Sequence, residues 1–404
     1  MQQFQDRLPV NRDRKFCYDI VFRKDFDTLF EESCRITPDF AAGASAATSA
    51  SGKDSAGKTS GGHTGDDEKD AFPYTKVMIV TDSAVAPLYL EEVRSKFTEH
   101  GIMPVSIVIE EGETQKTLDT VRSIYKNLIE QKFDRRSVLI ALGGGVVGDI
   151  TGFTAATYLR GIDYIQIPTT LLAQSDSSIG GKTGVDFDGY KNMVGAFKMP
   201  KLVYENISTL KTLDGRQFAS GFAEVMKSAL IRDEEFYVWL LNNLYEIRGR
   251  DVNTLQEMVY NSDLIKKLIV EKDPYEKSER RLLNFGHTLG HAIEKYKNFS
   301  LTHGECVALG CVAASFISWK KELISKEEYY EIRDMFVPFG LPISVEGIDE
   351  DRIIELAHSD KKAVGGTVPF VLLKSAGRAF VANNVSDEEM REALREIEWT
   401  EDGE

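Results

Sequence analysis

The sequence predicts an α/β protein in two parts, a mostly parallel sheet followed by a mainly helical region. Between residues 77 and 167, short apolar segments alternate with amphipathic ones at the spacing of βαβ units. After residue 213, long stretches with helical periodicity dominate. A chain of 404 residues is long enough for two domains, which we place at 1–212 and 213–404.

The alternation in the first part, which resembles a Rossmann-like domain, can be assigned segment by segment. Strands are expected at 77–81, 105–109, 137–142 and 164–167. Helices are expected between them, at 86–99, 118–131 and 147–158. Ligands bind at the carboxyl ends of the strands in such sheets. The residues that follow each strand are therefore the first candidates for a site.

The second part is predicted to be a group of amphipathic helices with one hairpin. Helices are expected at 218–231, 234–244, 254–271, 283–296, 304–320 and 326–336. Two short apolar segments, 368–373 and 379–381, predict a β-hairpin turning around Gly377. The Glu-rich C-terminal segment predicts a solvated helix.

Charge and cysteine content limit the possible partners and compartments. The formal net charge is −15, which argues against a nucleic-acid partner because phosphate-backbone binding needs a basic surface. The four cysteines form no CxxC pair, so reduced thiols in a cytoplasmic protein are expected. The N-terminus lacks the apolar segment of a secretory signal, and no apolar stretch is long enough to span a bilayer.

One low-complexity segment stands apart from the predicted fold. Of the 22 residues at 41–62, 19 are Ala, Gly, Ser or Thr, so a disordered insertion is expected over about 41–70. Residues 52–59 match the Walker A pattern letter for letter. A working P-loop needs a buried strand before it and a helix after it, and both flanks here are low-complexity. We therefore do not assign a nucleotide site to 52–59.

A second glycine-rich run has the context that 52–59 lacks. Gly143, Gly145 and Gly148 have the G-x-G-x-x-G spacing, directly after the apolar segment 137–142 and before an expected helix. Glycines let the backbone approach an anion, and a helix N-terminus offers unpaired N–H groups. The alternative is a tight turn in an α/β core.

Three of the six histidines fall within 17 residues of the helical part. His287 and His291 are four apart on one helical face, and His303 follows a short loop. Histidines with a carboxylate are the usual ligands of catalytic zinc. Spacing alone favours His287 and His291 as the ligand pair. The alternative is that all three are capping or core histidines.

Several lysines also occur in unusual settings. Lys182 and Lys191 lie in glycine-rich, loop-like sequence, where rigidly held lysines would suit phosphate or carboxylate binding. Lys227 lies one helical turn after Glu224. That pair could be a routine ion pair or part of a site.

Together these segments resemble 3-dehydroquinate synthase, a family of the sugar-phosphate cyclase superfamily. The likeness runs from about Val77 to Ala379. The matching stretches are GETQK (112–116), GGGVVGDITGF (143–153), YLRG (158–161), IPTTLLAQSDSSIGGKTGVDF (167–187), KNMVGAFKMP (191–200), GFAEVMK (221–227), RRLLNFGHTLGHAIE (280–294) and LTHGECV (301–307).

The resemblance implies an NAD-binding α/β domain and a helical metal-bearing domain with the active site between them. The reaction it implies converts 3-deoxy-D-arabino-heptulosonate 7-phosphate to 3-dehydroquinate and phosphate, in the shikimate pathway. NAD⁺ takes a hydride from the C5 alcohol, phosphate leaves by β-elimination, the hydride returns, and an intramolecular aldol step closes the ring. A zinc or cobalt ion would act as a Lewis acid.

The resemblance also implies roles for single residues. The matching metal ligands are Glu224, His287 and His303, which leaves His291 in the substrate site. The matching substrate residues are Arg160, Lys182, Asn192, Lys227, Lys266, Arg280, Asn284, His291 and Lys361, the last with Lys362 as its alternative. The matching NAD residues are Asp82, Glu111, Gly112, Glu113, Lys116, Gly144, Gly145, Val146, Val147, Gly148, Asp149, Thr169, Thr170, Asp176, Lys182, Lys191, Thr209 and Thr212.

Arg160 and two departures from the family pattern carry further expectations. In the family, Arg160 reaches the neighbouring subunit's site, which implies a homodimer. Ala84 stands where many members have an asparagine that contacts NAD, so binding should weaken by about one hydrogen bond, ~0.5–1.5 kcal/mol. Asp214 replaces a usual proline and should serve as a helix N-cap.

Three alternatives remain beside this assignment. The first is a sugar-phosphate cyclase whose substrate lacks a carboxylate. Lys266 and Arg280 argue against it, because idle buried cations would be unfavourable. The second is an iron-dependent alcohol dehydrogenase, which would not need so many phosphate-binding lysines. The third is a silent NAD-binding or scaffold protein, which should have lost metal ligands or site lysines.

Overall fold

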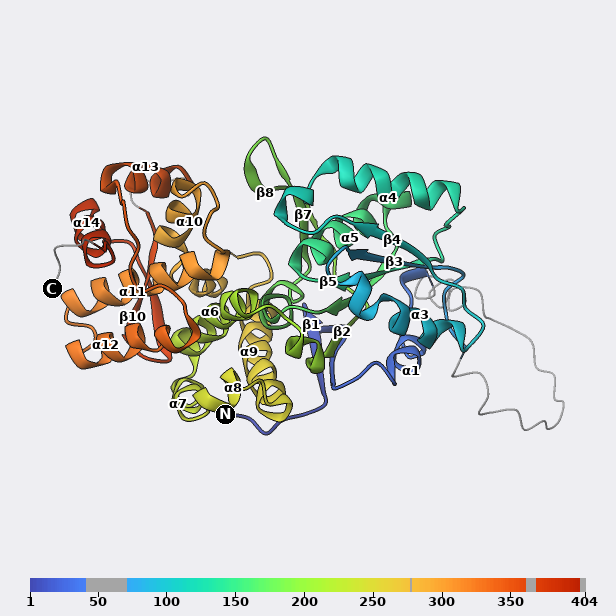
Figure 1. The fold of residues 1–404 in the computed structure, drawn as a ribbon, viewed down its shortest axis with the longest axis horizontal. Helices are drawn as coiled ribbons and strands as arrows, with labels where there is room; N and C mark the ends of the chain where they lie inside the picture. Colours follow the sequence, from blue (N-terminus) through green and yellow to red (C-terminus); the bar gives the residue numbers. More distant parts are fainter. Residues whose placement is uncertain (41–70, 277, 361–367, 400–404) are drawn as a thin grey trace, which may run out of the picture. The chain divides into compact units, whose positions relative to one another are not determined.

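The computed structural model describes residues 1–40, 71–276, 278–360 and 368–399, and contacts divide the chain into two units (Figure 1). The sheet unit comprises Asp6–Thr169 and Gly180–Ser208. The helical unit comprises Met1–Gln5, Thr170–Ile179 and Thr209–Glu404. The boundary expected at 212 and 213 falls close to Thr209, but Met1–Gln5 and Thr170–Ile179, which were expected in the first domain, group with the helical unit. The insertion expected over 41–70, with its Walker-like letters, lies outside the described residues.

The sheet unit is built on a seven-stranded sheet with the order β1-β2-β9-β6-β5-β3-β4. Only the β1–β2 pair is antiparallel; the other neighbouring strands run parallel. The predicted mostly parallel sheet is therefore confirmed. The strands are β1 (Arg7–Arg12), β2 (Lys15–Arg23), β3 (Val77–Asp82), β4 (Val105–Ile109), β5 (Val138–Gly143), β6 (Asp163–Pro168) and β9 (Leu202–Asn206).

Helices cover both faces of this sheet, as Figure 1 shows. Helices α4 (Leu118–Glu130) and α5 (Gly145–Thr157) pack on one face, and their core includes Met78 and Leu139. Helices α1 (Leu29–Cys34) and α3 (Glu91–Thr98) pack on the other, where the core includes Ile79 and Ile140. Alternate residues of β3 and β5 thus enter opposite cores. Burial on both faces explains the continuous apolar runs in the sequence.

Several elements of the sheet unit were not anticipated from the sequence. They are strands β1 and β2, helix α1 and the hairpin of β7 (Lys182–Phe187) and β8 (Tyr190–Phe197). The first two strands do have a period of two, because Leu8 and Val10 in β1, and Tyr18, Ile20 and Phe22 in β2, are buried. Asp19 lies within β2, where its carboxylate pairs with Arg7 Nη1 at 2.6 Å. Buried apolar side chains and ion pairs with other segments both stabilise β1 and β2. The helix expected at 86–99 begins with a wider turn, η1 (Ala86–Leu90), before α3.

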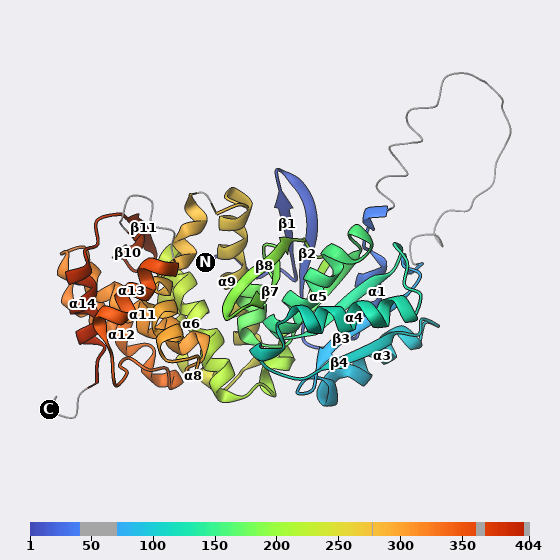
Figure 2. The same ribbon diagram turned by 90° about the horizontal axis from the view of Figure 1, so that it is seen from above.

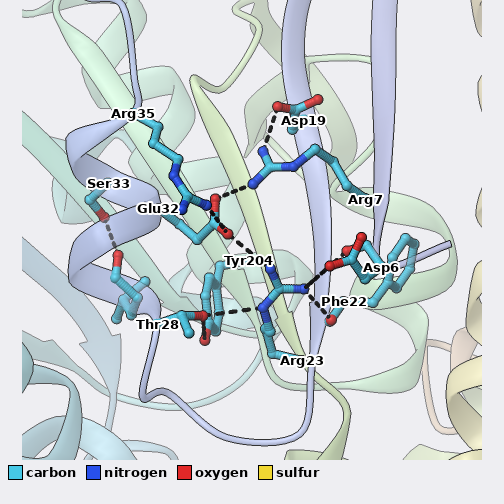
Figure 3. A network of polar contacts seen from close by, with 11 residues as sticks. Asp6, Arg7, Asp19, Phe22, Arg23, Thr28, Glu32, Ser33, Arg35 and Tyr204 are labelled. Carbon is cyan, nitrogen blue, oxygen red and sulfur yellow. Dashed lines mark hydrogen bonds and ion pairs between the residues drawn. The ribbon is translucent and has the colours of Figure 1, made fainter. Parts of the chain in front are cut away.

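Glu32 of α1 is the centre of a buried ion network that ties α1 to the first hairpin (Figure 3). Its carboxylate accepts from Arg7 of β1, from Arg23 Nη2 of β2 at 2.9 Å, and from Arg35 Nη1 at 2.8 Å. Burial alone would raise the pKa of Glu32, but these guanidinium groups outweigh it and lower the pKa. We name Glu32, Arg7, Arg23 and Arg35 the Glu32 network.

The helical unit is organised around α11 (His303–Lys320), which contacts α6, α10, α12, α14 and strand β10. Figure 2 shows the C-terminal helices gathered near this strand. Residues around the whole circumference of α11 are buried, from Gly304 to Ser318, so it is a core helix. The other helices are α6 (Gly215–Arg232), α7 (Glu234–Asn242), α8 (Leu244–Arg248), α9 (Val252–Lys272), α10 (His287–Tyr296), α12 (Lys326–Asp334), α13 (Glu350–Asp360) and α14 (Asp387–Glu396).

Most expectations for this unit are confirmed, including the hairpin of β10 (Phe370–Ser375) and β11 (Arg378–Ala382) around Gly377. The expected C-terminal helix is α14, although it buries Met390 and Leu394 and is not solvated all round. Asp214 is the N-cap of α6, accepting from the backbone N–H of Arg216 at 2.8 Å. Among the described helices, none combines the length and apolar character that a membrane crossing requires.

The helix expected at 283–296 is wrong in its first turn. A short 3-10 segment, η6 (Glu279–Asn284), comes first, and α10 begins only at His287. Gly286 between them has φ +77°, a left-handed conformation that ends any continuous helix. A Cβ at Gly286 would also lie 2.6 Å from Cys311 Sγ. The chain is therefore redirected at Gly286, which places His287 at the first position of α10.

Candidate active site

The glycine run of the sheet unit forms the expected strand–turn–helix. Strand β5 ends at Gly143, Gly144 is the N-cap, and α5 starts at Gly145. The N–H of Gly148 donates to the Gly144 carbonyl at 3.0 Å, which closes the first helical turn. A Cβ at Gly148 would lie 2.9 Å from Gln166 Oε1. This glycine lets α5 pack closely on β6, while the N–H groups before it lie at the helix N-terminus.

A polar group around Lys116 lies in the same unit. The Nζ of buried Lys116 is 2.7 Å from Asp149 Oδ2 and donates to Asn192 Oδ1 at 2.6 Å. Glu113 Oε1 is 3.9 Å from Lys116 Nζ and 4.0 Å from Lys191 Nζ. Burial lowers the pKa of Lys116, but Asp149 and Glu113 outweigh it and raise the pKa. The structure thus brings together five residues that the sequence assigned to the site.

Other predicted residues of this unit lie where the parallel strands end. Asp82 ends β3, and its Oδ1 accepts the backbone N–H groups of Ala84 at 3.0 Å and Val85 at 2.9 Å. Thr169 follows β6 and donates its N–H to the Gly143 carbonyl at 3.0 Å. Glu111 and Gly112 follow β4, Val146 and Val147 lie in the first turn of α5, and Lys182 starts β7. Arg160 differs from these residues, because it ends η3 (Tyr158–Arg160) just before β6 and therefore lies near the amino end of that strand.

The helical unit brings the predicted metal ligands together from three helices. Glu224 lies on α6, His287 on α10 and His303 on α11. Glu224 Oε1 is 3.4 Å from His287 Nε2 and 3.2 Å from His303 Nε2. His291 is also present, because one ligand atom from each of the three histidines lies within 4.8 Å of the others. Position alone therefore does not separate His291 from the other two histidines.

Glycines set the spacing of these three helices. A Cβ at Gly310 of α11 would lie 1.8 Å from the Gly286 carbonyl oxygen, just before α10. A Cβ at Gly304 would lie 2.1 Å from the Ser220 carbonyl oxygen of α6. At both positions a larger residue would force the helices apart. We name Gly304 and Gly310 the spacer glycines.

The carboxylates of this cluster act unequally on the two rings. Burial lowers the pKa of His287 to about 4. Burial also disfavours a charged His303, but Glu224 and Glu294 outweigh it and raise the pKa of His303 to about 9. The pKa of Glu224 is lowered, because Lys227 and the histidines outweigh its burial. Nitrogen and oxygen donors thus converge around one buried carboxylate, which is the donor chemistry of a divalent transition-metal site.

Buried cations lie beside these donors. Lys227, one turn from Glu224 on α6, pairs with Glu224 Oε2. Lys266 of α9 pairs with Asp176 Oδ1 at 2.6 Å. Burial and the neighbouring charges of Lys227 and Arg280 lower the pKa of Lys266, although Asp176 opposes them. Buried Arg280 donates from Nη1 to the Pro274 carbonyl at 2.7 Å. Asp176, predicted as an NAD contact, groups with the helical unit, as do Thr170, Thr209 and Thr212.

Two carboxylates in the loop before η6 were missed from the sequence. Asp273 Oδ2 accepts the backbone N–H of Ser278 at 2.6 Å and of Arg280 at 3.1 Å, which fixes the loop that carries Arg280. Glu276 Oε1 accepts from Asn284 Nδ2 at 3.0 Å, and Glu276 has φ +57°. Such a backbone conformation is strained for glutamate and often marks a functional site. A carboxylate four residues before a site arginine was the available signal in the sequence. Lys361 and Lys362 lie outside the described residues.

Comparison with known proteins gives consistent matches over both units. A family model described as 3-dehydroquinate synthase N-terminal matches residues 106–220, and one described as 3-dehydroquinate synthase C-terminal matches 221–363. A 3-dehydroquinate synthase of Acetivibrio thermocellus is 47% identical, over 78% of this chain and 88% of the relative. One of Ruminiclostridium cellulolyticum is 44% identical, over 80% of this chain and 90% of the relative.

Solved structures share the fold at lower identity. The 2-epi-5-epi-valiolone synthase ValA of Streptomyces hygroscopicus, with NAD⁺ and Zn²⁺ bound, superposes with a TM-score of 0.79 and 24% identity, covering 96% of this chain and 99% of that one. A 2-deoxy-scyllo-inosose synthase complexed with carbaglucose-6-phosphate, NAD⁺ and Co²⁺ gives a TM-score of 0.77 at 24% identity with the same coverage. At this identity the likeness establishes the fold alone.

Proposed function

This chain belongs to the 3-dehydroquinate synthase family, and from that membership we propose that it converts 3-deoxy-D-arabino-heptulosonate 7-phosphate to 3-dehydroquinate and inorganic phosphate. One observation carries the proposal beyond the family match. Buried Lys227, Lys266 and Arg280 lie in the same unit as Glu224 and its histidines. A substrate with two anionic groups requires such cations, and charge-assisted hydrogen bonds to them are strong.

A divalent metal ion fits the donors on α6, α10 and α11. Two Nε2 atoms face a single carboxylate oxygen, and zinc and cobalt both take such N and O ligands. We assign Glu224, His287 and His303 as the ligands and His291 to the substrate. When bound, the ion would supply Lewis acidity that polarises hydroxyl and carbonyl oxygens. Lys227, paired with Glu224, would hold that carboxylate in its ionised form.

An NAD cofactor fits the sheet unit at the turn between β5 and α5. The N-terminus of α5 favours a pyrophosphate through its N–H groups and partial positive charge. Lys116, held by Asp149, and Lys191 would add positive charge near the cofactor. When bound, NAD would accept a hydride from the substrate and return it within one turnover. The chain's own task here is to bind and orient the cofactor so that it is not released between the two transfers.

The cations of the helical unit would act on the substrate's anionic groups. In the elimination, a base takes a proton from the carbon next to the ketone and a carbon–carbon double bond forms. The carbon–oxygen bond to phosphate breaks, and phosphate leaves with the electron pair of that bond. Negative charge then gathers on the leaving oxygen, where fixed cations stabilise it. We assign Lys266 and Arg280 to the substrate carboxylate. Asn284, held by Glu276, would orient a hydroxyl group beside them.

The assignment can be tested with the purified protein and two substrates. The heptulosonate phosphate should release inorganic phosphate and form dehydroquinate with no net accumulation of NADH, and removal of the metal should abolish the reaction. Sedoheptulose 7-phosphate, which lacks the carboxylate, should not react. If sedoheptulose 7-phosphate reacts and the heptulosonate does not, the chain is a different cyclase.

We also propose a cytoplasmic homodimer. The four cysteines, all of which lie in the described residues, are not joined in disulfides, as expected for a reducing compartment. Leu159 and Arg160 have φ +50° and +69°, a conformation that side chains rarely adopt in two successive residues. Such a strained turn supports a specific role for Arg160 toward a second subunit. Light scattering should give twice the chain mass, and Arg160→Ala should reduce turnover without dissociating the dimer.

A further inference from the structure

The second ring nitrogen of each assigned ligand histidine faces a fixed partner outside the metal cluster. His287 Nδ1 lies 2.9 Å from the carbonyl oxygen of Phe285. His303 Nδ1 lies 3.6 Å from Glu294 Oε2, within ion-pair distance. Both Nε2 atoms face the same oxygen of Glu224. The two rings therefore share one orientation, with Nε2 toward the cluster and Nδ1 away from it.

Helix packing delivers Glu294 to His303. Glu294 lies on α10, two turns after His287, and its side chain is buried. His303 is the first residue of α11, which passes so close to α10 that a Cβ at Gly290 would lie 2.7 Å from the Cys306 carbonyl oxygen. A buried carboxylate is unfavourable unless a charged or hydrogen-bonding partner compensates it. The burial of Glu294 is therefore explained by its pairing with the His303 ring.

We propose that Glu294 and the Phe285 carbonyl hold His303 and His287 in the tautomer that carries hydrogen on Nδ1, which leaves Nε2 of each ring for the metal. The inference rests on the proposed function, because it takes these histidines as metal ligands. A carbonyl oxygen only accepts hydrogen bonds, so Nδ1 of His287 is the donor. A carboxylate sets the tautomer of His303 in the same way and makes the ring a stronger ligand.

Glu294 is thus a positioning residue, because it acts on the metal through His303. Gly286 has the corresponding role for His287. Its left-handed conformation turns the chain so that the Phe285 carbonyl faces the His287 ring. Nothing in the sequence alone distinguishes Glu294 from the other glutamates on the predicted helices. Its role depends on a contact between α10 and α11.

The Co²⁺-loaded protein gives a readout that is independent of activity. Ligand imidazoles with hydrogen on Nδ1 give proton resonances that Co²⁺ shifts strongly and that vanish in D₂O. We expect one such resonance each from His287 and His303 in the unaltered protein. Glu294→Ala should lose the His303 resonance to solvent exchange and bind Co²⁺ ~10–100-fold more weakly in competition with a chelator. Glu294→Gln keeps an acceptor of the same shape, so its Co²⁺ affinity should lie between those of the unaltered protein and Glu294→Ala.

Glu305→Ala is the matched control at the same helix start. Glu305 Oε2 accepts the Thr302 N–H at 2.7 Å and pairs with Arg216, so its loss weakens the N-terminus of α11 without touching the His303 ring. This variant should melt at lower temperature and keep both resonances and its Co²⁺ affinity.

The outcomes separate this inference from the proposed function. If the Glu294 variants keep both resonances and full Co²⁺ affinity, Glu294 has no positioning role although the metal site stands. Equal losses of affinity in the Glu294 and Glu305 variants would make the effect one of general stability and overturn the inference. If the unaltered protein binds no Co²⁺, the metal assignment and this inference both fail.

Discussion

Two glutamates, Glu224 and Glu32, are buried to the same degree in different units but have partners of different kinds. Their side chains are each 1% exposed, each has several cationic or ionisable partners, and each has a lowered pKa. The partners of Glu32 are three arginines. The partners of Glu224 are two histidines and a lysine.

The difference in partners separates a structural site from the proposed metal site. Arginine stays charged, and its planar fork can bridge several acceptors, as Arg7 does between Glu32 and Asp19. The Glu32 network therefore joins three segments of chain. Histidine instead offers a neutral nitrogen that can bind a metal. Burial and pKa shifts occur in both kinds of site, so the types of donor around the carboxylate distinguish a metal site from a structural ion network.

Removing the carboxylate of Glu224 should have the largest effect. We expect Glu224→Gln to lose the metal and reduce kcat/KM by ~10³-fold, because metal stabilisation of developing charge is lost while side-chain volume is kept. Phosphate release and metal content after dialysis measure the effect. A variant that keeps a tenth of the activity with its metal would remove Glu224 from the ligand set.

Arg280→Lys tests the assigned carboxylate site. The substitution keeps the charge but removes the two-pronged contact, so kcat/KM should fall by ~10–100-fold, the equivalent of a charged hydrogen bond. Steady-state kinetics with the heptulosonate phosphate measure this. Arg281→Lys is the control, because Arg281 is an exposed neighbour and should leave the kinetics unchanged. Equal effects in both variants would contradict a specific role for Arg280.

Glu32→Gln should affect stability and spare the chemistry. It leaves three guanidinium groups without their shared carboxylate, which should lower the free energy of unfolding by about 2–3 kcal/mol. Urea unfolding at neutral pH measures the change, and kcat should be retained. Glu31→Gln, on the exposed side of α1, is the control and should change stability little. A large drop in kcat for folded Glu32→Gln would contradict the comparison.

The same substitution has a defined pH dependence. Because the folded-state pKa of Glu32 is below its ordinary value of 4.5, its stabilising effect is complete above pH 4.5. The effect is lost as the pH falls through the folded pKa. The stability difference between the unaltered protein and Glu32→Gln should therefore be constant near neutrality and shrink in acid. Urea titrations from pH 7 to pH 3 follow it, and a difference that grows in acid would contradict the assigned pKa direction.

An exposed carboxylate gives the smallest expected effect. Asp214 caps α6 through the N–H groups of Arg216 and Gln217. Asp214→Ala should lower the free energy of unfolding by about 1 kcal/mol. Asp214→Asn, which can still accept those hydrogen bonds, should be close to neutral. Thermal melts of the two variants compare them directly.

The sequence predicts well those features that a short segment determines by itself. The β5–α5 turn follows from an apolar run and three glycines, and the N-cap at Asp214 from one residue type. Strands β1 and β2 were missed although their buried residues alternate, as Leu8 and Val10 do in β1. The charged residues between them, Arg7 and Asp19, obscure that pattern because they are paired only in the folded chain. The broken helix before His287 was missed because only tertiary packing against Cys311 shows why Gly286 is needed.

The candidate site likewise combines residues that the sequence indicates with residues that only tertiary contacts reveal. Residue types at helical spacing pointed to histidines and a carboxylate, and family resemblance supplied Glu224, which spacing had not selected as a ligand. Asp273, Glu276 and Glu294 were missed because each acts through another side chain or through the backbone. Such supporting residues leave no pattern in a single sequence. Their roles follow from distances that only the folded chain provides.

The spacer glycines have a consequence for which ions the protein can use. Gly304 lets α11 touch the backbone of α6, and Gly310 lets it touch the backbone just before α10. Main-chain contact therefore fixes the distances among the three helices that carry the proposed ligands. Side-chain rotation can adjust such a site only slightly. We therefore expect ions of nearly equal radius, such as zinc and cobalt, to substitute for each other. A larger ion such as cadmium would not be accommodated without separating helices that already touch.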